Sequence, residues 1–167
     1  MEKIKKSDIN FITKVIKIKR VTKVVKGGRR FRFSALVIVG NNNGIVGYGL
    51  GKANEVSLAT LKGAEQAKKN ILKIPIIHDT IPHVVIGQKN GGKILIKPAS
   101  QGTGVIAGGG ARIVFELAGI KNILSKSQGS KNSNNMIGAA FNALKQLRDP
   151  LSIAKSRNIT LNKLFNG

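Results

Sequence analysis

The chain carries a basic, glycine-containing stretch at residues 23–33, directly before an uninterrupted run of strand-forming residues at 34–40. The stretch holds five Lys or Arg residues, two glycines and two phenylalanines within eleven positions. Residues 34–40 favour a β-strand because aliphatic and β-branched side chains dominate them. We therefore expect a flexible basic loop that feeds a rigid strand, an arrangement that presents positive charge to a phosphate backbone.

The charge of the whole chain agrees with this interpretation. Lys and Arg number 29 against 7 Asp and Glu, which gives a formal net charge of +22 over 167 residues. Such a charge destabilises a compact state by self-repulsion unless a polyanion neutralises it. Nucleic acid is the favoured partner because each phosphate contact also releases a counterion. The alternatives are a merely soluble basic surface and an anionic membrane, but the sequence offers no lipidation signal for the latter.

Several classes of protein are excluded by composition. The chain has no cysteine, which rules out disulfides, thiolate metal sites and cysteine nucleophiles. No apolar run reaches the roughly 18 residues of a membrane span, so we expect a cytoplasmic protein without membrane contact. Aromatic residues make up 4% of the chain and Trp is absent, so the core must be aliphatic.

The first half of the chain predicts a β-β-β-α domain over residues 11–74, preceded by a flexible basic arm at 1–10. Gly47, Gly49 and Gly51 alternate along one face of the third strand, where they allow close approach of either RNA or the helix behind. The sequence Asn41–Gly44 predicts the turn of a hairpin. The expected elements are strands at 11–21, 31–40 and 45–50 and a helix at 54–72.

The second half predicts a β-β-α-β-α domain over residues 75–150, so the fold class is α+β with two small α/β domains. Gly119 is expected to end the first helix of this domain, and Asp149–Pro150 to end the second. Residues 151–167 are expected to form a loosely attached basic tail. The expected elements are strands at 81–86 and 93–97, a helix at 111–118, a strand at 120–126 and a helix at 132–147.

The sequence predicts no catalytic site, metal or cofactor. The seven carboxylates are scattered, and His78, Asp79 and His83 fall short of a zinc site. Gly102-x-Gly104 resembles a dinucleotide fingerprint but lacks the acidic residue about 20 positions later. Gly51-Lys52 lacks the first glycine and the metal-binding hydroxyl of a phosphate loop.

Two motifs leave alternatives open. The glycine-rich loop at residues 102–110 could set backbone N–H groups against an RNA phosphate or could form a tight crossover against a neighbouring protein. Phe31 and Phe33 lie on one side of a strand, opposite Arg30 and Arg32. The phenylalanines could stack on bases, but alternation favours core packing with the arginines outward.

Two long motifs resemble a known family. Residues 21–59, with Lys26-Gly27-Gly28-Arg29-Arg30-Phe31 and Gly47-Tyr48-Gly49-Leu50-Gly51-Lys52, are similar to the fifth protein of the small ribosomal subunit, bacterial type. So are residues 97–109, Lys97-Pro98-Ala99-Ser100-Gln101-Gly102-Thr103-Gly104 onward, and residues 116–120 and 129–132. The similarity spans about residues 10–150 in unbroken order.

The resemblance implies a first domain like a double-stranded-RNA-binding domain and a second domain of the family's C-terminal type. It also implies a structural, non-catalytic constituent of the small subunit that stabilises the head–body junction and the region where messenger RNA enters, and that supports translational accuracy. The implied partners are small-subunit ribosomal RNA, messenger RNA near its entrance channel and the fourth and eighth small-subunit proteins. Gly104 and Arg112 fall in the region of partner-protein contact.

We accordingly expect RNA binding by basic side chains of strand, loop and helix. A free regulator that binds double-stranded RNA and a small-molecule kinase are the alternatives; for the latter, the sequence offers only Glu116, on a helix, as an acid near the glycine-rich loop. The expected RNA-binding residues are Lys14, Lys17, Arg20, Lys23, Lys26, Gly27, Gly28, Arg29, Arg30, Arg32, Lys52, Lys68, Lys69, Lys126 and Lys131.

Overall fold

The computed structural model describes residues 10–166, which form two compact units. The first unit runs to Lys73 and also includes Ile113–Gly119; the second comprises Ile74–Arg112 and the chain from Ile120 onward. The expected arm at 1–10 lies outside the described residues except for Asn10. The mixed α and β composition of both units confirms the predicted α+β class.

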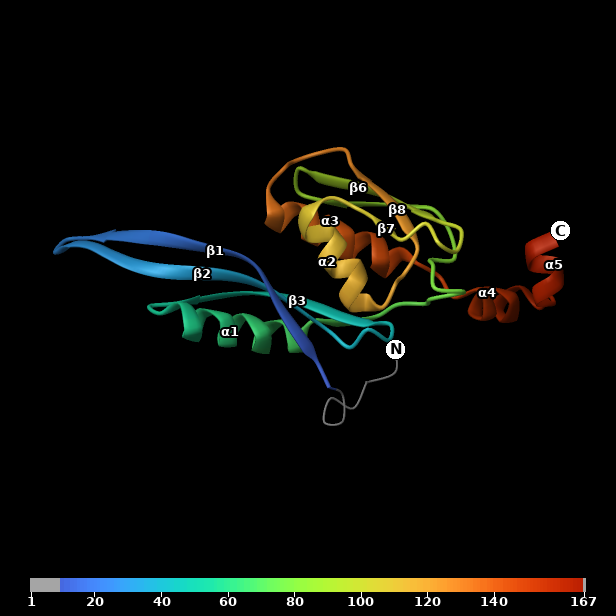
Figure 1. Cartoon of the computed structure of the whole chain (residues 1–167), viewed down its shortest axis with the longest axis horizontal. Helices are drawn as coiled ribbons and strands as arrows, with labels where there is room; N and C mark the ends of the chain where they lie inside the picture. The colour runs from blue at the N-terminus through green and yellow to red at the C-terminus, as the bar shows by residue number, and fades with distance from the viewer. Residues whose placement is uncertain (1–9, 167) are drawn as a thin grey trace. The chain divides into compact units, whose positions relative to one another are not determined.

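The first unit is an antiparallel sheet with a helix on one face (Figure 1). Its strands follow the order β1 (Ile12–Val25), β2 (Gly28–Gly40), β3 (Ile45–Ala53) and β4 (Ile71–Lys73). Helix α1 (Val56–Lys69) follows β3, so the predicted β-β-β-α order is present with a short fourth strand added. The predicted turn at 41–44 joins β2 to β3, and the Asn41 side chain accepts hydrogen bonds from the N–H groups of Asn43 and Ile45.

The first two strands are longer than the sequence predicted, and the expected flexible loop between them was wrong. Strand β1 continues to Val25 and β2 begins at Gly28, so only Lys26 and Gly27 form the turn. Residues 21–25 remain rich in β-branched side chains, and such residues favour an extended strand. The result is a hairpin whose tip projects beyond β3 and α1 (Figure 1).

The glycines of β3 face helix α1, which settles the alternative that the sequence left open. A Cβ atom at Gly49 would collide with the carbonyl oxygen of Gly63, and one at Gly51 with that of Ala59. The helix therefore lies against the strand backbone, where only glycine fits. A small core forms beside this contact from Ala35, Val37, Ala53 and Ala59, with Phe33 and Ala64 packed against it.

The second unit has a four-stranded sheet in the order β5 (Val85–Lys89), β6 (Gly92–Pro98), β8 (Ile123–Ser127) and β7 (Val105–Ile106). The pairing of β7 with β8 is parallel and the other pairings are antiparallel. Helix α3 (Ser133–Gln146) packs on β5 so closely that a Cβ at Gly87 would meet the carbonyl oxygen of Ala139. Helix α2 (Gly109–Ala118), whose residues from Ile113 onward belong to the first unit, ends at Gly119, whose φ of +88° fits the predicted C-cap.

Several boundaries differ from the predicted ones. Strand β5 begins at Val85 instead of residue 81, and Pro82, which has no N–H to donate to a strand ladder, precedes it. Strands β4 and β7 were not predicted, because three and two residues are too few to show a period. The tail contains two helices, α4 (Pro150–Arg157) and α5 (Leu161–Asn166). Helix α3 ends at Gln146, before the predicted stop at Asp149–Pro150, and Pro150 instead begins α4, since proline suits a first helical turn.

Candidate nucleic-acid interface

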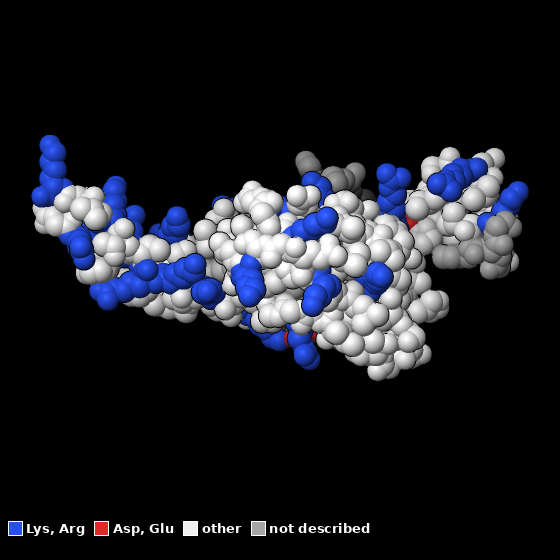
Figure 2. Space-filling view, turned by 90° about the horizontal axis from the view of Figure 1, so that it is seen from above, with Lys and Arg blue, Asp and Glu red and all other residues white. Residues whose placement is uncertain are grey.

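Basic side chains lie together on one face of the β1–β2 hairpin, and Lys52 of the adjacent strand β3 lies on the same face. Residues directly opposite in an antiparallel pair share a face, and side chains alternate between faces. Lys23 lies opposite Arg30, Val21 opposite Arg32, Lys19 opposite Ser34 and Ser34 opposite Lys52. All of the basic side chains concerned are exposed, and Figure 2 shows Lys and Arg along the hairpin. We call this surface the basic face; it consists of Lys17, Lys19, Lys23, Arg30, Arg32 and Lys52.

Lys19 is a member of the basic face that the sequence prediction omitted. It stands two positions after Lys17 in the same strand, so both side chains point to one side. The alternation Lys17-Ile18-Lys19 already carried this signal in the sequence.

The basic face is electrostatically unfavourable by itself. Lys23 and Arg30 are direct cross-strand neighbours, and like charges at such positions destabilise a sheet. Residues 12–33 contain nine Lys or Arg residues and no Asp or Glu. No acidic side chain within the hairpin can therefore offset this repulsion, whereas a bound polyanion would remove it and gain counterion release.

The opposite face of the hairpin has a different chemistry. Its members are Arg20, Thr22, Val24, Arg29, Phe31 and Phe33, and we call it the aromatic face. The predicted split between the two phenylalanines and Arg30 and Arg32 is thus confirmed. Phe33 packs on the small core, as expected. Phe31 does not: it is 48% exposed, and the Arg20 guanidinium carbon lies 3.7 Å from its ring centroid. The prediction that Phe31 packs in the core was wrong, because the core ends at Phe33.

The turn at the hairpin tip is open on all sides. A Cβ atom at Gly27 or Gly28 would meet no other atom within 4 Å. Gly28 has a φ of +117°, which side chains rarely permit. The tip, with Lys26 exposed beside the glycines, can therefore approach a partner backbone closely.

The other predicted RNA-binding residues do not join the basic face. Lys14, opposite Ile38, lies on the same side of the sheet but nearer the strand start, away from the cluster, and its Nζ is 3.6 Å from the Glu116 carboxylate. Lys68 and Lys69 end helix α1, which covers the glycine side of the sheet, and Lys68 Nζ lies 5.9 Å from the Phe11 ring centroid.

Lys126 and Lys131 are exposed in the second unit. Arg20 and Arg29 belong to the aromatic face.

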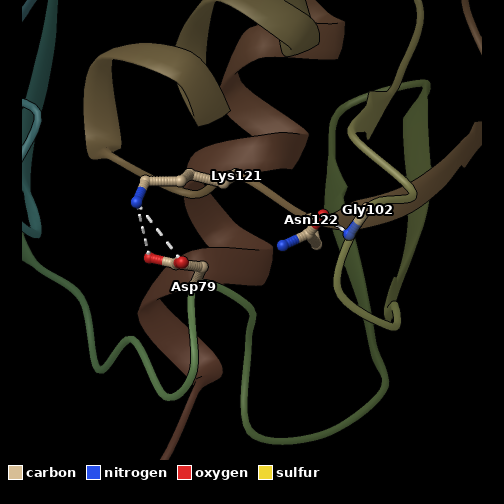
Figure 3. A network of polar contacts seen from close by, with 4 residues as sticks. All are labelled: Asp79, Gly102, Lys121 and Asn122. Atoms are coloured by element: carbon tan, nitrogen blue, oxygen red, sulfur yellow. Dashed lines mark hydrogen bonds and ion pairs between the residues drawn. The ribbon is translucent and has the colours of Figure 1, made fainter.

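The loop at Gly102–Gly104 is held by a buried asparagine of the second unit (Figure 3). Asn122, which is 5% exposed, accepts hydrogen bonds on its side-chain oxygen from the N–H groups of Gly102 and Gly104, each at 3.1 Å. The N–H of Thr103 donates to the carbonyl oxygen of Ser100. All three N–H groups are therefore satisfied internally, which disfavours a phosphate-binding role for this part of the loop. Arg112 is exposed on α2.

The described residues show no site for metal chemistry. Within residues 10–166, no three His, Cys, Asp or Glu side chains are placed to hold a metal ion. His83 has a structural partner, since its Nε2 lies 3.2 Å from the backbone nitrogen of Arg148 and accepts a hydrogen bond from that N–H. None of the helices in this part of the chain has the length and hydrophobicity to cross a membrane.

Comparison with known proteins identifies the family. Residues 11–75 match the family described as "Ribosomal protein S5, N-terminal domain", and residues 87–157 match "Ribosomal protein S5, C-terminal domain". The chain belongs to the ribosomal protein S5 family. The resemblance drawn from its glycine-rich motifs is therefore confirmed, and the two matched segments correspond to the two kinds of α/β domain that it implied.

Curated members of the S5 family are similar over nearly the whole chain. The protein of Salinibacter ruber is 54% identical over 158 residues, which cover 95% of this chain and 90% of that protein. Those of Bacteroides thetaiotaomicron and Thermotoga maritima are 50% and 52% identical, and cover 96% and 94% of this chain and 94% and 88% of theirs. Each is named small ribosomal subunit protein uS5. Membership in this family makes the chain a structural ribosomal protein and not an enzyme.

Proposed function

We propose that this chain is a structural constituent of the small ribosomal subunit that binds ribosomal RNA through the basic face of its β1–β2 hairpin. The observation that carries this assignment is the cross-strand pair of Lys23 and Arg30 in a hairpin without acidic residues. A protein retains such repulsion where an anionic partner offsets it. The names of the relatives, all small-subunit proteins, support the same partner.

The hairpin would act by reaching into the RNA and contacting phosphates. Pairing of β2 with β3 ends at Phe33 and Ala53, so the five residues from Gly28 to Arg32 project with their β1 partners. At about 3.4 Å per residue this ribbon extends roughly 17 Å beyond the three-stranded region. The deep major groove of an A-form helix cannot be read by side chains. Shape and phosphate contacts, more than base edges, would therefore supply the affinity on paired RNA.

The finer roles that the resemblance implies also form part of this proposal. The protein would stabilise the junction of head and body, contact messenger RNA near its entrance channel and support translational accuracy. The fourth and eighth small-subunit proteins would be its protein neighbours, with contacts at Gly104 and Arg112. Support for this contact comes from the Asn122 side chain, which fixes the backbone at Gly102 and Gly104 so that the loop presents one conformation.

The phosphate assignment is tested by the salt dependence of RNA binding. The logarithm of the association constant falls with the logarithm of salt concentration, with a slope of about 0.7–0.9 for each phosphate neutralised. We expect the triple variant Lys19→Ala, Lys23→Ala and Arg30→Ala to reduce this slope by about 2–3 relative to the wild type. Binding of ribosomal RNA transcripts would be measured by filter retention or fluorescence anisotropy across a series of KCl concentrations.

A control that removes two charges elsewhere, compared per charge with the three of the hairpin variant, separates local contact from net charge. Lys145→Ala with Lys155→Ala removes two exposed cations from helices α3 and α4 of the second unit. This double variant should leave the slope almost unchanged. If the control and the hairpin variant lower the slope equally per charge, the attraction is diffuse and the basic face is not the binding surface.

A further inference from the structure

The aromatic face of the hairpin carries an exposed ring for which the phosphate-binding role gives no reason. Phe31 is 48% exposed although the neighbouring Phe33 packs on the core. Ile18 and Val24 on the same side are 44% and 76% exposed. Arg20 and Thr22 separate the two aliphatic residues, so this strip mixes apolar and polar side chains.

Arg20 and Phe31 form a preassembled stack within this strip. The guanidinium carbon of Arg20 lies 3.7 Å from the ring centroid of Phe31, well inside the range of a cation–π contact. Both residues sit in paired strands, so the backbone places them on one face, and the cation–π contact brings the two flat groups together. Aromatic rings and arginine planes are the two kinds of side chain on which proteins stack unpaired bases.

The two faces of the hairpin therefore differ in the ligand chemistry they suit. The basic face carries three lysines, two arginines and Lys52 from the next strand. Lysine ammonium groups are compact charges and arginine guanidinium groups are bidentate donors, and both suit phosphate. The aromatic face has no lysine; its cations are the two arginines Arg20 and Arg29, placed among Phe31 and Val24. Because residues 12–33 hold nine basic and no acidic side chains, a nucleic acid complements this face better than an apolar protein surface would.

We infer that the Arg20–Phe31 pair is a stacking platform for an unpaired RNA base, on the side of the hairpin opposite the phosphate-binding basic face. This inference rests on the proposed function and deepens it, because it adds recognition of unpaired RNA to phosphate binding. The hairpin would then bind where a helix meets a loop or bulge. The basic face would contact the backbone of the paired region, while the platform holds a base that leaves the stack.

The test compares two RNA probes with equal numbers of phosphates: a hairpin with an eight-nucleotide loop that contains 2-aminopurine, and a blunt duplex. The protein variants are Phe31→Leu, which keeps an apolar side chain but removes the aromatic plane, and Arg20→Lys, which keeps the charge but removes the guanidinium plane. Circular dichroism and thermal unfolding check that each variant folds. Affinities are measured at several salt concentrations.

The platform predicts that the wild type prefers the looped probe and quenches its 2-aminopurine. Phe31→Leu should weaken binding of the looped probe by about 5- to 100-fold, as expected for the loss of one stacked base. It should change duplex binding less than about twofold and leave the salt slope unchanged. Arg20→Lys should also weaken binding of the looped probe and should leave the slope of the salt dependence unchanged.

Three outcomes would overturn the platform: a wild type that does not distinguish the two probes, a Phe31→Leu variant that keeps its affinity, or an equal loss on both probes. The last result would mean that Phe31 only supports the fold of the hairpin, because no protein partner is present in the assay. None of these results affects the basic face, whose failure shows separately as an unchanged salt slope in the Lys19, Lys23 and Arg30 variant.

Discussion

The side-chain oxygen of Asn122 lies 3.1 Å from the backbone nitrogen of Gly102 and accepts its hydrogen bond (Figure 3). The same oxygen accepts the N–H of Gly104, so one buried side chain fixes both ends of a tight turn. Gly102 and Gly104 have φ values of +90° and +75°. The asparagine thus stabilises a backbone conformation that is otherwise accessible mainly to glycine.

Replacement of Asn122 by Ala should destabilise the protein markedly. Two part-buried N–H groups would lose their acceptor, and an unsatisfied buried polar group costs about 1–3 kcal/mol. We expect a loss of that size in the free energy of unfolding measured with urea. Asn142→Ala, which removes an exposed hydrogen bond to the Gln88 carbonyl oxygen, serves as the control and should cost less. Equal losses for the two variants would mean that the Asn122 contact has no special importance.

The neighbouring ion pair should matter much less. Lys121 Nζ lies 3.2 Å from the Asp79 carboxylate (Figure 3), but the two side chains are 73% and 39% exposed. Exposed pairs contribute about 0–1 kcal/mol because water and salt screen them. Lys121→Ala should therefore lower the free energy of unfolding by less than about 1 kcal/mol. This difference from the wild type should disappear at high salt, which screens the ion pair. A loss as large as that of Asn122→Ala would contradict this ranking.

The glycine contact between β3 and α1 predicts a steric effect. Gly49→Ala would place a Cβ against the Gly63 carbonyl oxygen, and the helix would have to move away from the strand. Overpacking of this kind costs about 1–3 kcal/mol. Gly27→Ala at the hairpin tip is the matched control, because its Cβ meets nothing within 4 Å. Thermal unfolding of both variants measures the difference, and a Gly49→Ala variant as stable as the wild type would refute the close packing.

The cross-strand repulsion between Lys23 and Arg30 predicts that removing it stabilises the free protein and weakens RNA binding. Lys23→Glu would create an opposite-charge pair across the strands, which should stabilise the free protein by about 0.2–1 kcal/mol. The same change should weaken RNA binding, because a phosphate contact becomes a repulsion. The gain in stability should shrink near 1 M salt, where the screening length falls to about 3 Å. If the Lys23→Glu variant is less stable than the wild type at low salt, repulsion between Lys23 and Arg30 does not destabilise the free protein.

Periodic features of this protein could be predicted from the sequence, because several residues of a repeating pattern support the same assignment. Lysines in near alternation with β-branched residues predicted the first strand over residues 11–21, and Gly119 marked the end of a helix. The same alternation includes Lys19, and the β-branched residues at 21–25 favour a first strand that continues to Val25. The glycine pair at 27–28 instead suggested a flexible loop, although two residues suffice for a hairpin turn.

Contacts between distant residues could not be predicted in this way. Asn122 is separated from Gly102 by 20 positions, and no local pattern marks which polar side chain will satisfy a distant loop. The exposure of Phe31 depends on where helix α1 and the core end, which is a tertiary property. Strand β7 exists only because β8 lies beside it, and its two residues carry no signal of their own.

The most direct test of the central claim is the composition of small ribosomal subunits after a high-salt wash. Subunits from a native lysate would be separated on a sucrose gradient, and this chain would be quantified by mass spectrometry against other small-subunit proteins. A structural constituent should remain with the washed particle at about one copy per subunit, because many phosphate contacts act together. Sedimentation as free protein, or complete loss into the wash, would contradict the account and favour an RNA-binding regulator that acts outside the ribosome.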